Sequence, residues 1–222
     1  MFKRRTGTEP SARPVDLRVE DPDPRWTPLV HPEILARTEW QTPAAWADEV
    51  AALMIMAFSG VVPGLRSGEA DHETALERTK SVILDAYQWM VPTLTMFDLS
   101  FLVFVHPAVV PIPVEVRQFP SEGERIDTLR LLAGVGVTHV VEKPEPVVFE
   151  TEQLGTGLRG LYGQTPKKRS GAILGALSYG FRLDEHGRDV RVLASHPDLG
   201  LLVASIDAID ELVRAVTVEP IG

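Results

Sequence analysis

A glycine-rich segment has the spacing that could bind a nucleotide. Residues 155–160 read Gly-Thr-Gly-Leu-Arg-Gly and match the dinucleotide fingerprint, whose glycines let the backbone approach a pyrophosphate at the beginning of a helix. The next residues, 158–164, and Pro166 beyond them predict an extended segment instead of that helix. We therefore interpret the glycines as a bend in a strand or hairpin, and we assign no cofactor.

Ser178 could be taken for a catalytic nucleophile. It stands in the sequence Gly-Ala-Leu-Ser-Tyr-Gly of residues 175–180, which is close to the nucleophile elbow of α/β-hydrolases but lacks the glycine two residues before the serine. The elbow exposes its hydroxyl at a sharp turn from strand to helix, whereas Ser178 lies inside a predicted strand. We interpret it as a small packed or outward-facing residue, and we assign no catalytic residue.

The histidines and carboxylates could bind a metal or transfer protons, but their spacing favours neither. No two of the 6 histidines stand four residues apart as a helical metal pair would. The acidic residues lack the pattern of a calcium loop, and the chain has no cysteine, so we assign no metal site. One alternative stays open, a small enzyme or ligand-binding protein whose site is built from scattered residues, namely His106, His139, Asp98 and Glu115.

Composition restricts the kind of partner. The formal net charge of the 222 residues is -9, and basic clusters are limited to residues 3–5 and 167–169, so we expect no nucleic-acid partner. The longest uncharged stretch, residues 50–65, is shorter than the roughly 20 residues that a membrane span needs. Because no apolar segment follows the basic N-terminus, we expect a cytoplasmic protein without a signal peptide. The preference for arginine over lysine is typical of a GC-rich bacterium.

The chain is expected to form a tail and one domain. Residues 1–25 combine four prolines with alternating charge and few large apolar side chains, which predicts a mobile tail. Residues 26–222 contain no internal repeat and no linker long enough to divide them. We therefore predict a single domain over 26–222.

Two helices are predicted near the start of that domain. Thr42 followed by Pro43 is a typical helix start, and apolar residues at helical spacing continue from there to Gly60. A second helix is expected to begin at Asp71 and to end before Pro92. These elements form the expected N-terminal helix pair.

The rest of the chain predicts mostly strands. Residues 173–183 alternate with period two, a turn follows, residues 190–194 resume the alternation, and residues 202–216 change to helical spacing. Ser121 and Glu124 have the spacing of a capping box before a short helix. The other strand-like runs cover residues 96–105, 114–119, 137–142, 147–152 and 158–164. This order predicts an α+β fold with a mainly antiparallel sheet flanked by helices.

The last part of the chain resembles a known fold group. The segment GALSYGFRLDEHGRDVRVLASHPDLGLLVASIDAIDELVRAVTV is similar to the end of PsbP-like α/β sandwich domains, in which a long hairpin precedes a closing helix with an (F/I)-D-x-I element, here at residues 206–209. The resemblance extends over about residues 95–218 and implies a PsbP-like sandwich of the actinobacterial type. Members of the group act mainly by binding proteins. The resemblance supplies no functional residue.

The leading hypothesis is therefore a non-enzymatic module that binds another protein or assists an assembly. Met56 and Phe58 do not fall on the apolar stripe of their helix that contains Trp46. Together with Trp89 they form the expected interaction surface, since methionine and tryptophan are common at adaptable interfaces. A second alternative is an acidic immunity-type protein that binds a basic partner. The sequence leaves the oligomeric state open.

Overall fold

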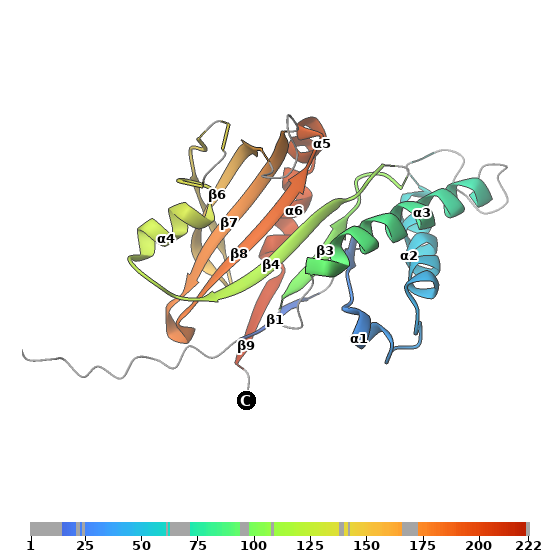
Figure 1. Cartoon of the computed structure of the whole chain (residues 1–222), viewed down its shortest axis with the longest axis horizontal. Coiled ribbons are helices and arrows are strands. Elements are labelled where there is room, and N and C mark those ends of the chain that lie inside the picture. The colour runs from blue at the N-terminus through green and yellow to red at the C-terminus, as the bar shows by residue number, and fades with distance from the viewer. Residues whose placement is uncertain are drawn as a thin grey trace, which may run out of the picture.

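The sheet at the centre of the protein is antiparallel throughout. The computed structural model describes residues 15–20, 23, 25–60, 62, 72–93, 98–107, 109–137, 140–141, 143–165 and 173–220. Seven strands in these ranges form one sheet in the order β2-β3-β4-β8-β7-β6-β5 (Figure 1). Their bounds are β2 Trp26–Pro28, β3 Leu99–Val103, β4 Ile112–Pro120, β5 Val147–Thr151, β6 Gly155–Gln164, β7 Leu174–Leu183 and β8 Arg188–His196. The predicted α+β class with a mainly antiparallel sheet is confirmed.

A two-stranded sheet joins the first and last strands of the chain. β1 (Val15–Val19) pairs antiparallel with β9 (Val216–Pro220), and Val15 and Leu17 are buried in the main core. Residues 15–19 belong to the predicted tail of residues 1–25, so this part of the expectation is corrected. Residues 1–14, 21, 22 and 24 of that tail lie outside the described part of the chain.

The hairpin of β7 and β8 forms where the alternating pattern predicts it. A 3-10 turn, η2 (Asp184–His186), joins the two strands, and Gly187 adopts the left-handed conformation with φ 60°, which favours glycine. Leu183 then pairs with Arg188, and the ladder continues to the pair of Gly175 with His196. This register decides which side chains of β8 face each side of the sheet.

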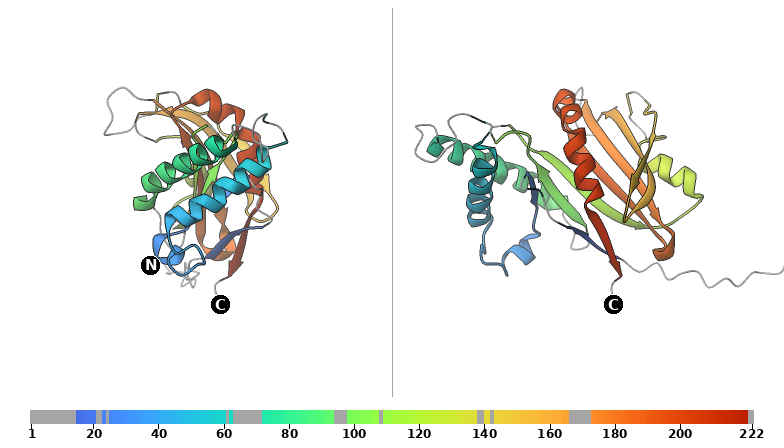
Figure 2. Two further views of the ribbon diagram at one scale, coloured as in Figure 1. Left: turned by 90° about the vertical axis from the view of Figure 1, so that its right-hand side faces the viewer. Right: turned by 180° about the vertical axis from the view of Figure 1, so that it is seen from behind.

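Two short helices cover the back of the sheet, as Figure 2 shows in its right-hand view. α5 (Leu199–Ala204) and α6 (Ile206–Arg214) pack their apolar side chains on β7 and β8 in the main core. The single helix predicted over residues 202–216 is thus divided. Ser205 ends α5 and donates its hydroxyl to the carbonyl of Leu201 (2.7 Å), and Val216 already belongs to β9.

Two longer helices cover the opposite face of the sheet, which we call the front, at its β3 edge. α2 (Pro43–Phe58) and α3 (His72–Met90) follow the short α1 (Pro32–Leu35) and enclose a second core with Leu102 and Phe104 from the β3 edge. Thr42 caps α2 as predicted, since its hydroxyl accepts from the amide of Ala45 (3.2 Å). The 3-10 turn η1 (Val91–Thr93) follows α3, whereas Asp71, the expected first cap of that helix, lies outside the described residues.

Glycines let α4 (Arg125–Leu132) lie directly on the other part of the front. A Cβ atom on Gly160 of β6 would lie 2.0 Å from the carbonyl oxygen of Ala133, and one on Gly180 of β7 would lie 2.6 Å from the Cβ of Leu132. The hydroxyl of Ser178 donates to the Leu132 carbonyl (2.6 Å). Residues 155–160, interpreted as a bend in a strand or hairpin, form the regular first part of β6, and Ser178 is a packed residue that holds the end of α4.

Two local expectations need correction. The N-cap of α4 is Glu124, whose side chain makes no capping bond, while the Ser121 hydroxyl donates to Asp189 (3.1 Å). The capping box is therefore absent, because α4 begins after Glu124 and Ser121 is not its N-cap. The predicted strand over residues 137–142 is reduced, among its described residues, to one bridge between Val140 and Gln164.

The packing of α4 predicts that Gly160→Ala destabilises the fold. Its new methyl group would meet the Ala133 backbone, so we expect the free energy of unfolding to fall by about 1–3 kcal/mol in urea denaturation. Gly60→Ala is the matched control, since a Cβ there meets nothing within 4 Å and should change the value by less than about 0.5 kcal/mol. Equal effects of the two variants would contradict the role of Gly160.

Candidate functional site

The helices on the front of the sheet lie over its two sides and leave its middle strands uncovered. α4 lies over β6 and β7, and α2 with α3 lies over the β3 edge, so no described helix covers β4 and β8 between them (Figure 1). The side chains that face the front here are partly exposed. We call this surface the open strip, and it consists of Glu115 and Arg117 of β4 and Arg191, Leu193 and Ser195 of β8.

Two positive charges face each other across the open strip. Arg117 and Arg191 are direct cross-strand partners in the β4–β8 ladder, an arrangement that is destabilising for like charges. Glu115, two residues from Arg117 on the same face, forms an ion pair with it at 2.9 Å. Arg117 and Glu115 each make a further contact as well, and the β3–β4 register places Asp98 opposite Arg117.

Arg191 lies at the edge of the open strip that is next to α4. Its Nε is buried and has no hydrogen-bond partner among the described residues. Its backbone partner on the neighbouring strand β7 is Gly180, and Leu132 of α4 packs on that glycine. Burial raises the pKa of the nearby Tyr162 hydroxyl, while the positive charge of Arg191 and a hydrogen bond with Ser178 oppose that shift. The Nε–H of Arg191 is therefore a buried donor without an acceptor among the described residues, which calls for an explanation.

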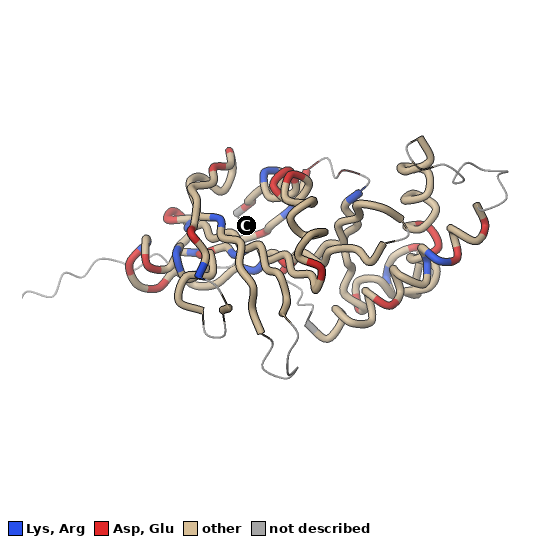
Figure 3. The backbone as a smooth tube through the Cα atoms, turned by 90° about the horizontal axis from the view of Figure 1, so that it is seen from above, with Lys and Arg blue, Asp and Glu red and all other residues tan. Residues whose placement is uncertain are grey.

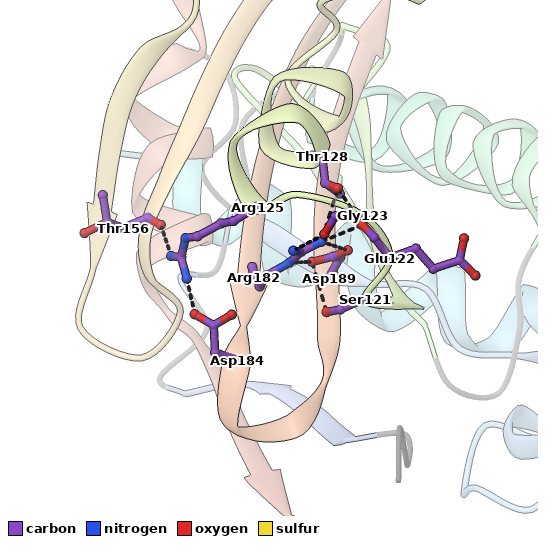
Figure 4. A network of polar contacts seen from close by, with 9 residues as sticks. All are labelled: Ser121, Glu122, Gly123, Arg125, Thr128, Thr156, Arg182, Asp184 and Asp189. Carbon is purple, nitrogen blue, oxygen red and sulfur yellow. Dashed lines mark hydrogen bonds and ion pairs between the residues drawn. The ribbon is translucent and has the colours of Figure 1, made fainter. Parts of the chain in front are cut away.

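A larger polar network at the base of the β7–β8 hairpin is closed instead (Figure 4). Arg182 and Asp189 are a buried ion pair with Nε to Oδ1 at 2.6 Å. The other two nitrogens of Arg182 donate to the carbonyls of Glu122 and Gly123 (both 2.9 Å) and to the hydroxyl of Thr128 (3.1 Å). Hydrogen bonding to Asp189 raises the pKa of Arg182. Since all its nitrogens are bonded, this network holds the loop before α4 in place and offers no donor to a ligand.

A second closed network connects the sheet to α6. The Tyr179 hydroxyl donates to Oδ1 of Asp210, and Nη1 of Arg159 lies at Oδ2, both at 2.5 Å. Burial and then the hydrogen bond to Asp210 raise the pKa of Tyr179 well above its usual value. The Phe149 ring packs edge-on against Tyr179 with centroids 5.0 Å apart, and Arg214 lies over its face at 4.9 Å. The polar groups of Tyr179, Arg159 and Asp210 thus find their partners within the protein.

The scattered residues of the enzyme alternative are brought together only in part, since the β3–β4 register places Asp98 near Glu115 but not near His106. Asp98 immediately precedes β3, whereas His106 follows it and packs its ring 6.5 Å from that of Phe58. A strand of five residues separates their two ends by roughly 15 Å, beyond the reach of a shared proton or metal. Glu115 lies on the open strip, and His139 lies outside the described residues.

The expected interaction surface is not one patch. Met56 and Trp89 are exposed by 67% and 61%, but Phe58 is only 9% exposed and belongs to the second core. Contacts of Trp46 with Tyr87 place the end of α3 beside the beginning of α2, so Trp89 lies far from Met56 at the end of α2. The inclusion of Phe58 is therefore corrected. Its position off the Trp46 stripe is explained by burial against the His106 loop.

The open strip was not identified from the sequence. Its charges lie far apart in the chain, and acidic and basic positions are intermixed along the described backbone (Figure 3). Within the described ranges, no group of three or more His, Asp and Glu side chains could hold a metal ion, and no helix is long and apolar enough to cross a membrane. Only the register of β4 with β8 reveals the arginine pair.

The chain matches no protein-family model, and comparisons with curated proteins and with solved structures find no significant similarity.

The closed hairpin network predicts a strong dependence of stability on Arg182. Arg182→Gln leaves the Asp189 carboxylate buried without its cation, so the free energy of unfolding should fall by about 3–5 kcal/mol, measured by urea denaturation. Arg130→Gln on the exposed side of α4 is the control and should change it by less than about 0.5 kcal/mol. A loss below about 1 kcal/mol for Arg182→Gln would show that the pair does not hold the loop.

Proposed function

We propose that this chain is a non-enzymatic binding module that holds a segment of another protein on the open strip. The observation that carries the proposal is the pair of arginines opposed across β4 and β8, with the buried Nε of Arg191 lacking a partner among the described residues. Arg117 already has Glu115 as a partner, so the proposal rests on Arg191, whose like-charged neighbour and buried nitrogen, unpartnered within the described residues, lower stability. A bound partner supplies the contact that Arg191 lacks.

The composition of the open strip supports protein binding. Arginine is enriched at protein interfaces and often contributes much of their binding energy. Leu193 adds an apolar surface between the charged residues and Ser195, and the partly exposed side chains of the strip leave it accessible. Guanidinium, hydroxyl and apolar groups side by side recognise a peptide through both hydrogen bonds and burial.

The proposal extends to the fold group. We propose a PsbP-like sandwich in which the β7–β8 hairpin and the helices α5 and α6 correspond to the characteristic final segment. The helix pair of α2 and α3 is then an additional front layer. This relationship agrees with a binding role, because members of that group act mainly by binding proteins.

Site-specific photo-crosslinking tests the location of the binding surface. Benzoyl-phenylalanine in place of Leu193 should give one discrete adduct in cells, whereas the same probe in place of Val203, which is 46% exposed on α5, should not. The partner identified in the adduct is then purified, and its affinity for the chain is measured by calorimetry.

We expect Leu193→Glu to weaken that affinity about tenfold or more, because it removes apolar contact and adds a charge. Val203→Glu should leave it unchanged. Adducts only from position 203, or an affinity insensitive to Leu193→Glu, would place the partner elsewhere and overturn the proposal.

A further inference from the structure

We infer that the outer edge of β5 binds an extended segment of a partner protein, in which an acidic residue and an apolar residue are neighbours. β5 is the last strand of the main sheet, and among the described strands it pairs only with β6. β6 and β7 separate it from β8 and the open strip. The inference therefore adds a second binding surface and does not depend on the proposed function.

The two edges of the main sheet are protected to different degrees. Very short strands, prolines and lysines are common means by which proteins prevent the addition of another strand to an edge. The β2 edge has only three residues and ends in Pro28, which has no amide hydrogen to donate. β5 has five residues without proline or lysine, and Val147 and Val148 are 47% and 66% exposed. Its outward backbone groups can pair with an added strand.

A positive charge lies beside this edge on the back of the sheet. The exposed Arg214 of α6 lies 4.9 Å from the centre of the Phe149 ring, in the middle of β5. Its neighbours on α6 have other partners, since Asp210 is bound by Arg159 (2.5 Å) and Glu211 lies 3.2 Å from Arg25. No described carboxylate forms an ion pair with Arg214. An acidic residue on an added strand would be complementary to this charge.

The alternation of β5 gives the order of residues that a partner strand needs. Phe149 faces the back of the sheet, where Arg214 lies, whereas Val148 and Glu150 face the front. An antiparallel strand places one residue opposite each of these positions, with Cβ atoms about 5 Å apart. An acidic residue opposite Phe149 can then reach Arg214, and the residue after it covers Val148. The residue before it lies opposite Glu150 and is preferably basic.

A second copy of the chain fits this edge less well. Pairing of β5 with its own copy over all five residues is centred on Phe149, and it places Val148 opposite Glu150. No carboxylate then lies opposite Phe149, so Arg214 gains no partner. The formal net charge of -9 on each copy also opposes self-association. These two facts favour a segment of a different protein.

A short peptide tests the inference. The probe is an acetylated and amidated Gly-Thr-Lys-Glu-Val-Val-Gly peptide, and the readout is the set of backbone ¹H–¹⁵N signals of β5 in NMR of the full chain. We expect saturable shifts of these signals. Affinity should fall about tenfold when glutamine replaces the peptide glutamate, since a charge-assisted hydrogen bond is lost.

Methylation of the peptide backbone tests strand addition itself. Successive residues of an added strand direct their amides alternately toward β5 and away from it. One peptide carries N-methyl groups on the lysine and the first valine, and the other carries them on the glutamate and the second valine. We expect one of the two to bind like the unmodified peptide and the other to lose the β5 shifts.

A variant of the chain tests the contribution of Arg214. Arg214→Gln should weaken binding of the Glu peptide about tenfold and leave the affinity for the Gln peptide unchanged, because the two substitutions remove the same interaction. Circular dichroism verifies that the variant is folded. Arg130→Gln, on the exposed side of α4, is the matched control and should bind the Glu peptide like the unmodified chain.

Four results would overturn the inference. They are the absence of a saturable β5 shift, equal binding of the two methylated peptides, equal affinity for the Glu and Gln peptides, and an unchanged affinity of Arg214→Gln for the Glu peptide. Shifts of the β5 signals with protein concentration alone would show that a second copy occupies the edge, and they would also overturn the choice of partner.

Discussion

The register of the β7–β8 hairpin is the constraint on which both the fold and the candidate site depend. Gly187 in the left-handed conformation and the buried pair of Arg182 with Asp189 fix the closed end of the hairpin. A slip by one residue would turn every side chain of β8 to the opposite face. The main core would then lose the apolar face of β8, and Arg191 would leave the front of the sheet.

The front of the sheet combines two different solutions to the burial of a β-sheet face. Glycines on β6 and β7 bring α4 into backbone contact, while the larger side chains of the β3 edge are buried by α2 and α3 in a second core. Neither of these helix layers extends over the open strip between them. Polar networks elsewhere, around Arg182 and Asp210, satisfy their own groups, whereas the buried Nε of Arg191, like Trp26 Nε1 and His196 Nε2, has no partner among the described residues. Such local departures are expected at functional sites.

Local patterns in the sequence predicted what local interactions determine. The β7–β8 hairpin, the Thr42 cap and the strand-like run over residues 158–164 follow from periodicity, capping and turn chemistry. The pairing of β1 with β9 joins opposite ends of the chain, and β1 is too short to reveal it. Phe58 was misplaced because its burial depends on a distant loop. The open strip could not be found, since Arg117 and Arg191 become partners only through long-range strand register.

The central claim is that Arg191 contributes to binding and lowers the stability of the free protein. The most direct measurement is the free energy of unfolding of Arg191→Met in urea, without ligand. The substitution removes a like-charge neighbour of Arg117 and a buried donor without a partner among the described residues. We expect this free energy to increase by about 1 kcal/mol. A decrease of about 1 kcal/mol or more would show that Arg191 stabilises the fold and would contradict the account.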